Sequence, residues 1–163
     1  MFAPGDLIVY GRTGVCRVEA IEQRDGQAFY RLSPLYQTCA ISTPVQGKVF
    51  MRPVLTRAEA EALIDRIPTV EAPPVECSAL RELTGRYQAA ITSHEAAEVL
   101  ALTMSIYAKK QKLLREKRKF GAVDERFLRE GEALLFGELA VALDIAPEAV
   151  PAYIQARLER SRR

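Results

Sequence analysis

Few side chains in this sequence are suited to catalysis, and those present lack the partners that catalysis needs. His94 is the only histidine, and it stands beside Glu95 at the expected start of a helix, where a histidine is usually a surface or capping residue. A nucleophile, a base and an orienting group cannot be assembled around it at any identifiable spacing. The glycines form neither G-x-x-x-x-G-K-[ST] nor G-x-G-x-x-G, the patterns of nucleotide-binding loops. We therefore expect a protein that is not an enzyme and that acts through what its surfaces bind.

The cysteines give no sign of a disulfide framework or a metal site. Cys16, Cys39 and Cys77 are odd in number and show no C-x-x-C spacing, which fits a reducing compartment. The first residues lack a basic and then apolar leader, and no apolar run approaches the roughly 20 residues of a membrane span. These features predict a cytoplasmic protein that uses no metal ion and no cofactor.

One segment concentrates positive charge, although the net charge of the chain is only +2. Between residues 105 and 120 there are seven cations, with Glu116 as the only acidic residue. Eleven helical residues span about three turns, or ~16 Å, enough to follow a DNA backbone with salt-dependent, sequence-independent contacts. A solvated helix face, with Leu113 and Leu114 turned inward, explains the same pattern. This basic run consists of Lys109, Lys110, Lys112, Arg115, Lys117, Arg118 and Lys119.

The secondary structure that the sequence predicts changes from strands to helices near residue 55. In the first part, Cys16, Val18 and Ala20 alternate with charged neighbours, as in a strand with one buried face, and Asp25-Gly26 predicts a hairpin. Five short strands in about fifty residues predict a Tudor- or SH3-like small β-barrel. The expected strands lie near residues 6–10, 15–22, 28–32, 38–45 and 49–52.

Beyond residue 55 the sequence predicts helices. Thr56 and Glu59 form a capping box before an apolar helical stripe, and residues 68–77 contain three prolines, which indicates a stiff linker. We expect an α+β protein with a barrel over residues 1–54, a connecting helix and Pro-rich linker over 55–77, and an all-α domain over 78–163.

Several local signals predict where the later helices begin and end. Thr92 and Glu95 suggest a second capping box before a helix over residues 94–119, and Phe120-Gly121 suggests a left-handed glycine cap after it. Asp124 is expected to cap the next helix, and Pro147 to lie in the first turn of the last one. Gly85, inside a helix over residues 78–92, costs roughly 1 kcal/mol relative to alanine, which suggests a close contact there.

Short islands in both halves resemble the CarD/CdnL family of bacterial transcription regulators. The opening Phe-x-x-Gly-Asp-x-Ile-Val-Tyr, followed by Gly14-Val15, matches the N-terminal signature of that family. The same module is the polymerase-interacting domain of transcription-repair coupling factors. Further islands are residues 18–22, Pro44, Val49-x-x-Arg52, Arg86-Tyr87 and residues 136–140.

The resemblance implies a Tudor-like domain that docks on the β subunit of bacterial RNA polymerase. The helical domain then reaches promoter DNA at the upstream edge of the melted bubble and stabilises the open complex. Arg24 matches a basic polymerase-contacting position, and a second such position falls on Ser42. Together with Arg52 these residues form the expected polymerase-binding set. Without the resemblance, we would interpret Arg24 as a solvated hairpin residue.

On the DNA side, some relatives carry a tryptophan wedge four residues before the tyrosine of the Arg-Tyr pair, and this position is Leu83 here. Leucine serves as an apolar wedge in other minor-groove binders, but its spacing from Leu80 and Tyr87 also suits a core residue. Arg86 is expected to contact a DNA phosphate. The expected DNA-binding set is therefore Leu83, Arg86 and the basic run.

A second hypothesis is a protein-interaction adaptor, in which the helical domain binds protein and the basic run is a solvated face. The missing tryptophan and Ser42 favour it. Under the first hypothesis the partners are RNA polymerase and weakly, non-specifically bound promoter DNA, and polymerase carries the protein to the nucleoid. Neither hypothesis predicts a small-molecule substrate or a membrane partner.

Overall fold

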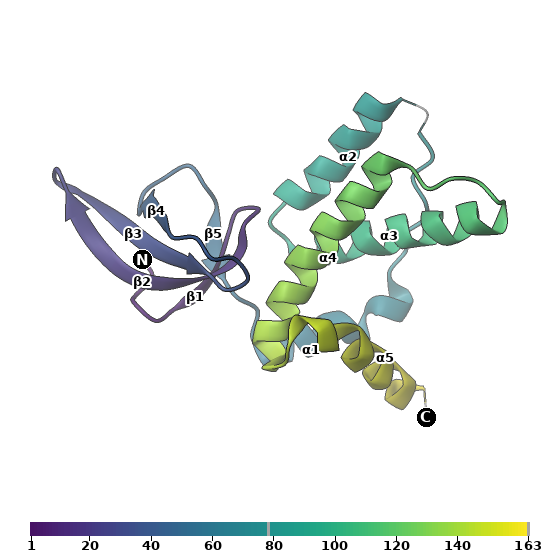
Figure 1. Cartoon of the computed structure of the whole chain (residues 1–163). Coiled ribbons are helices and arrows are strands. Elements are labelled where there is room, and N and C mark those ends of the chain that lie inside the picture. The colour runs from purple at the N-terminus through teal and green to yellow at the C-terminus, as the bar shows by residue number, and fades with distance from the viewer. Residues whose placement is uncertain (78, 163) are drawn as a thin grey trace.

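A computed structural model describes residues 1–77 and 79–162. It contains a five-stranded antiparallel sheet followed by a group of helices, so the expected α+β class is confirmed (Figure 1). The strand order in the sheet is β4-β3-β2-β1-β5. The strands are β1 (Leu7–Tyr10), β2 (Gly14–Arg24), β3 (Gln27–Pro34), β4 (Ile41–Pro44) and β5 (Met51–Pro53).

The sheet does not close into the barrel that the sequence suggests. β4 and β5 form its two edges, and no ladder joins them among the described residues. Both edge strands are short and end in proline, Pro44 and Pro53, which has no N–H to donate across a closing ladder. The curved sheet still encloses its own core of five buried side chains, namely Ile8, Cys16, Val18, Tyr30 and Leu32.

A β-bulge in β2 changes which side chains face the core. The expected hairpin at Asp25-Gly26 is confirmed, with both residues at positive φ (50° and 78°), as a type I′ turn requires. The register against β3 shifts between Val18 and Ala20. After this shift Ala20 lies opposite the exposed Arg31, so the expected alternation with a buried Ala20 is wrong. The bulge turns the later even-numbered residues of β2 to the outer face.

Within residues 1–77 and 79–162, five α-helices follow the sheet, and the longest of them, α4, runs through the middle of the group (Figure 1). None of the described helices is long and apolar enough to cross a membrane. The helices are α1 (Arg57–Asp65), α2 (Leu80–Thr92), α3 (Ala96–Arg115), α4 (Ala122–Leu143) and α5 (Val150–Ser161), with 3₁₀ turns η1 (Ile67–Thr69) and η2 (Pro147–Ala149).

The connecting helix and the Pro-rich segment pack as parts of the helical group. The capping box at Thr56 and Glu59 is confirmed, and α1 contributes Leu63 and Ile64 to a core shared with α3, α4 and α5. The Pro-rich segment lies against α3, where the Ser105 hydroxyl donates to the Pro73 carbonyl at 2.7 Å. The expected domain boundary at residue 78 and the chain end at residue 163 lie outside the described residues.

The helix ends near α3 differ from those that the sequence suggests. Thr92 is the last residue of α2, and its hydroxyl donates to the Gln88 carbonyl, so it makes no second capping box. His94, at φ 63°, makes the left-handed turn before α3, and no side chain among the described residues caps that helix. Local sequence could not show that α2 extends through the expected cap.

The far end of α3 is also earlier than expected. Lys117 adopts the left-handed conformation, with φ 55°, and α3 ends at Arg115 rather than at residue 119. Gly121 is the N-cap of α4 rather than the C-cap of α3, and Asp124 is a buried first-turn residue instead of a cap. The basic run is therefore divided between the last turns of α3 and the loop that follows.

Gly85→Ala is expected to stabilise the protein. Gly85 is exposed within α2, and an added Cβ would meet no atom within 4 Å, so the close contact suggested by the sequence is absent among the described residues. The substitution should raise the free energy of unfolding in urea by roughly 1 kcal/mol. Gly131→Ala in α4 is the control, because its Cβ would lie 2.8 Å from Thr103 Cγ2. It should lower stability, and equal effects of the two substitutions would refute this explanation.

Candidate functional site

The outer face of the sheet carries two arginines that share one carboxylate. The β2 bulge places Glu22 and Arg24 on the same face as Phe29 and Arg31 of β3. Arg24 Nη2 lies 3.0 Å from Glu22 Oε2, and Arg31 Nη1 lies 3.4 Å from Glu22 Oε1. The Arg24 guanidinium also lies 5.7 Å from the centre of the Phe29 ring. These four residues, Glu22, Arg24, Phe29 and Arg31, form a half-exposed surface that we term the arginine patch.

Ser42 lies beside the arginine patch on the edge strand. In the register of β3 and β4 it stands directly opposite Arg31, and its side chain is exposed. The described sheet pairs β4 with β3 alone, so the other side of β4 carries backbone groups without a strand partner. Arg24 and Ser42, both expected to contact polymerase, therefore lie on one accessible surface.

Arg52, the third expected polymerase contact, lies inside the molecule. Its Nη1 and Nη2 donate to the Glu138 carboxylate at 2.6 and 2.7 Å, and its Nε donates to the His94 carbonyl at 2.8 Å. The two side chains are only 19% and 5% exposed. The hydrogen bond with Glu138 raises the pKa of Arg52. Arg52 and Glu138, with the His94 carbonyl, form an interdomain clamp, and this position differs from the surface position that a polymerase contact requires.

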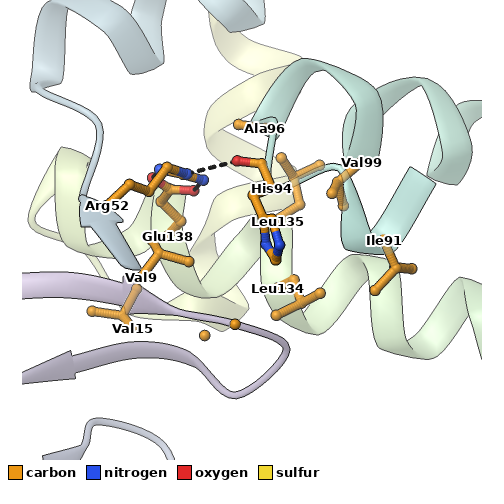
Figure 2. Close-up of a pocket in the computed structure, with 12 residues that line it drawn as sticks. Val9, Val15, Arg52, Ile91, His94, Ala96, Val99, Leu134, Leu135 and Glu138 are labelled. Carbon is orange, nitrogen blue, oxygen red and sulfur yellow. Dashed lines mark hydrogen bonds and ion pairs between the residues drawn. The ribbon is translucent and has the colours of Figure 1, made fainter. Parts of the chain in front are cut away.

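The interdomain clamp borders a small apolar cavity between the sheet and the helices (Figure 2). Figure 2 shows Val9 and Val15 on the sheet side and Leu134 and Leu135 on the helix side. Its volume of about 30 Å³ is that of a single water molecule, so it is too small for an organic ligand. We interpret it as a packing gap at the joint between the two halves.

Three further contacts join the sheet to the helices. The Phe50 and His94 rings stack with centroids 4.3 Å apart and an interplanar angle of 11°. The Tyr36 hydroxyl donates to the Gly137 carbonyl at 2.8 Å, and Arg12 pairs with Glu130. Together with the interdomain clamp, these contacts fix the direction in which the arginine patch points relative to α3 and α4.

The expected DNA-contacting residues of α2 occupy different environments. Leu83 is only 2% exposed and packs with Tyr87 and Ile91 in the core between α2, α3 and α4. An apolar wedge must project into solvent, so Leu83 does not have the exposure that this role requires. Arg86 is exposed on the same helix, and it makes no ion pair with the described residues.

Three cations of the basic run are held by carboxylates of the protein itself. Lys109 Nζ lies 3.1 Å from Asp124 Oδ1, and both side chains are largely buried. Lys112 pairs with Glu76 of the Pro-rich segment, and Arg118 pairs with Glu116 at 3.3 Å. The other four cations make no ion pair with the described residues: Lys110, Arg115, Lys117 and Lys119.

The sequence did not reveal the carboxylates that hold these cations. Asp124 was expected at a helix start as a cap, whereas it accepts from the Tyr87 hydroxyl at 2.6 Å and from Lys109. Glu138 lies in one of the family-like islands, but the island did not indicate its partner. For Glu138, the available signal of a buried partner was its acidic side chain inside an apolar helical stretch. In the described part of the chain no group of three or more His, Cys, Asp or Glu residues could hold a metal ion.

Comparison with known families identifies the first part of the chain. The family model described as the CarD-like/TRCF RID domain matches residues 2–55, about a third of the sequence. These residues form an RNA polymerase-interacting domain of the kind found in transcription-related proteins, and RNA polymerase is the partner that it indicates. No curated protein matches the chain closely enough to count as a relative. The matched range contains the whole sheet, the arginine patch, Ser42 and Arg52.

Removal of one partner of the interdomain clamp is expected to be strongly destabilising. Arg52→Ala leaves the Glu138 carboxylate buried without its partner, and this should lower the free energy of unfolding by about 3–5 kcal/mol. The double variant Arg52→Met/Glu138→Leu should cost less than Arg52→Ala, because it leaves no unpaired charge. Chemical denaturation of the variants measures both effects.

The control for the clamp is Arg12→Ala, which breaks the more exposed bridge to Glu130. Because the Arg12 side chain is 41% exposed, its loss should cost no more than about 1 kcal/mol. An equal cost for Arg12→Ala and Arg52→Ala would contradict a special role for the clamp.

Tyr87→Phe is expected to change how stability depends on alkaline pH. Burial and the hydrogen bond to Asp124 raise the pKa of Tyr87 well above its usual value of 10.0. Above this usual value the unfolded chain releases the phenol proton while the folded protein keeps it, so stability falls as pH rises. Tyr87→Phe should lower stability at neutral pH by roughly 1 kcal/mol and make the alkaline decline shallower. Tyr107→Phe, at a residue 55% exposed, should leave that decline unchanged in the same urea titrations.

Proposed function

We propose that the CarD-like/TRCF RID domain of this protein docks on the β subunit of bacterial RNA polymerase, and that the helical part stabilises the promoter open complex by weak, sequence-independent DNA contacts. The match of residues 2–55 to a polymerase-interacting domain is the observation that carries the proposal. The protein is then a transcription regulator and not an enzyme, and it acts in the cytoplasm at the nucleoid.

The joint between the two halves supports a bridging role. Arg52 and Glu138 link the last strand of the RID domain to α4, so a docked RID domain would present the helical part in one direction. Polymerase would hold the helices near DNA at a high effective concentration, so the DNA contact can be weak by itself. A contact made only in the open state, worth about 1–2 kcal/mol, changes the lifetime of that state by roughly ten-fold.

The cations of the basic run that form no ion pair with the described residues are the best supported DNA contacts, although Lys110 also lies 5.6 Å from the centre of the Phe120 ring. Lys110, Arg115, Lys117 and Lys119 leave their charges available near the end of α3 and in the following loop. Lys109, Lys112 and Arg118 are already neutralised by Asp124, Glu76 and Glu116. We therefore assign the phosphate contacts to the first group, with Arg86 as a further candidate.

Two observations favour the second hypothesis, a protein-interaction adaptor. Leu83 is buried, which removes the apolar wedge from the DNA-binding set. Tyr107 and Leu114, seven residues apart on α3, are 55% and 58% exposed, and residues at this spacing share a helix face. A protein partner would bury these two side chains, whereas a phosphate backbone would not.

The lifetime of promoter open complexes distinguishes the two hypotheses. The protein should prolong this lifetime with bacterial RNA polymerase, and the effect should weaken as salt increases. The triple variant Arg115→Ala/Lys117→Ala/Lys119→Ala should lose most of the effect while still binding polymerase. Arg66→Ala/Arg160→Ala/Arg162→Ala removes the same charge from exposed positions at the C-terminal ends of α1 and α5, and it should act like the unaltered protein.

Each other outcome has a definite meaning. If the protein binds polymerase but does not change the lifetime of the open complex, the adaptor hypothesis would be favoured. Equal losses in the two triple variants would show a non-specific charge effect. Absence of polymerase binding would refute the proposal as a whole.

A further inference from the structure

A groove larger than the cavity of Figure 2 lies where the sheet meets the helical part. It has a volume of about 560 Å³ and is lined by the β1–β2 turn, the loop after β3, one side of α4, and η2. Ligand pockets commonly measure about 300–1,000 Å³ and often lie between domains. We infer that this groove binds a linear aliphatic polyamine, whose methylene chain lies on apolar side chains and whose ammonium groups contact Glu132 and Glu148.

Apolar side chains from both halves form much of the groove. A Cβ built on Gly137 would lie 2.9 Å from Tyr36 Cε2, so the Tyr36 ring packs directly on α4 where the helix carries no side chain. The ring is still 49% exposed, so a large part of its surface remains open to a ligand. Burial of methylene groups against such a lining favours an aliphatic chain. The other apolar residues of the lining are Val15, Ala133, Leu134, Phe136 and Pro147.

The charged side chains of the groove favour a cation. Both arginines of the lining, Arg12 and Arg129, are already paired with glutamates of α4. Two of the three lining glutamates, Glu132 of α4 and Glu148 of η2, make no ion pair or hydrogen bond with the described residues. An anion would be repelled by these two carboxylates, and a neutral ligand would leave them unpaired. Two ammonium groups on one ligand would satisfy both.

The position of Glu148 relative to Tyr36 supports the same ligand. Burial and, after it, the charge of Glu148 raise the pKa of the Tyr36 hydroxyl above its usual value, so the two side chains are close enough to interact. An ammonium group bound by Glu148 is then also within reach of the tyrosine ring, whose face attracts cations. An inorganic cation would gain nothing from the apolar lining, so the groove favours an organic one.

Isothermal titration calorimetry of the full chain with spermidine tests the inference. We expect saturable binding at one site per chain. Glu132→Gln/Glu148→Gln should weaken the affinity at least ten-fold, because it removes both carboxylates that the ammonium groups contact. Glu71→Gln/Glu82→Gln removes the same charge from exposed positions outside the groove and should bind as the unaltered protein does. Equal losses in the two double variants would show a non-specific charge effect and overturn the inference.

A variant that fills the groove tests the position of the ligand without changing any charge. Ala133 is exposed on α4, so Ala133→Trp should leave the core intact and abolish spermidine binding. The matched control is Ala89→Trp, on the exposed face of α2, which should bind normally. Circular dichroism checks that both variants fold. Normal binding by Ala133→Trp, displacement of spermidine by an equal concentration of Mg²⁺, or absence of binding by the unaltered protein would overturn the inference. None of these results depends on the proposed polymerase contact.

Discussion

The largely buried ion pair between Arg52 and Glu138 is the interaction that joins the sheet to the helical part. Withdrawal of two charges from water is costly, and an ion pair offsets this cost only when its geometry is good and its remaining hydrogen-bonding groups are satisfied. Here the guanidinium binds the carboxylate through two nitrogens and the His94 carbonyl through a third, while Glu138 also accepts from the Leu55 amide at 2.9 Å. Hydrogen bonds have direction, so this arrangement selects one orientation of the sheet on the helices, which apolar packing alone specifies less sharply.

That orientation connects the two surfaces on which the proposed function depends. The arginine patch lies on the outer face of the sheet, and the unpaired cations lie near the end of α3 and in the loop beyond it. A bridge between an enzyme and its template needs these surfaces at a constant separation, because movement between them would weaken the second contact once the first has formed. The Pro-rich segment supports the same arrangement, since Ser105 and Lys112 hold it against α3.

Sequence patterns predicted what depends on neighbouring residues and missed what depends on distant ones. The strands, the Asp25-Gly26 hairpin and the capping box at Thr56 follow from local periodicity and turn chemistry. The bulge between Val18 and Ala20 has no comparable signal, yet it decides which face carries Arg24. The basic run illustrates the same limit, because the partners of Lys109 and Lys112 are Asp124 and Glu76, which lie 15 and 36 residues away in the sequence. The islands of family resemblance included Arg52 and Glu138 without revealing that they touch.

In the proposed function, the helical part reaches DNA only when the RID domain is docked on polymerase. A photo-crosslinking group introduced at residue 117, in the loop after α3, tests this most directly in promoter complexes. We expect crosslinks to promoter DNA that require RNA polymerase and disappear when Arg24→Glu is added to the labelled protein. Crosslinks to protein alone, or equal crosslinking to DNA without polymerase, would contradict it.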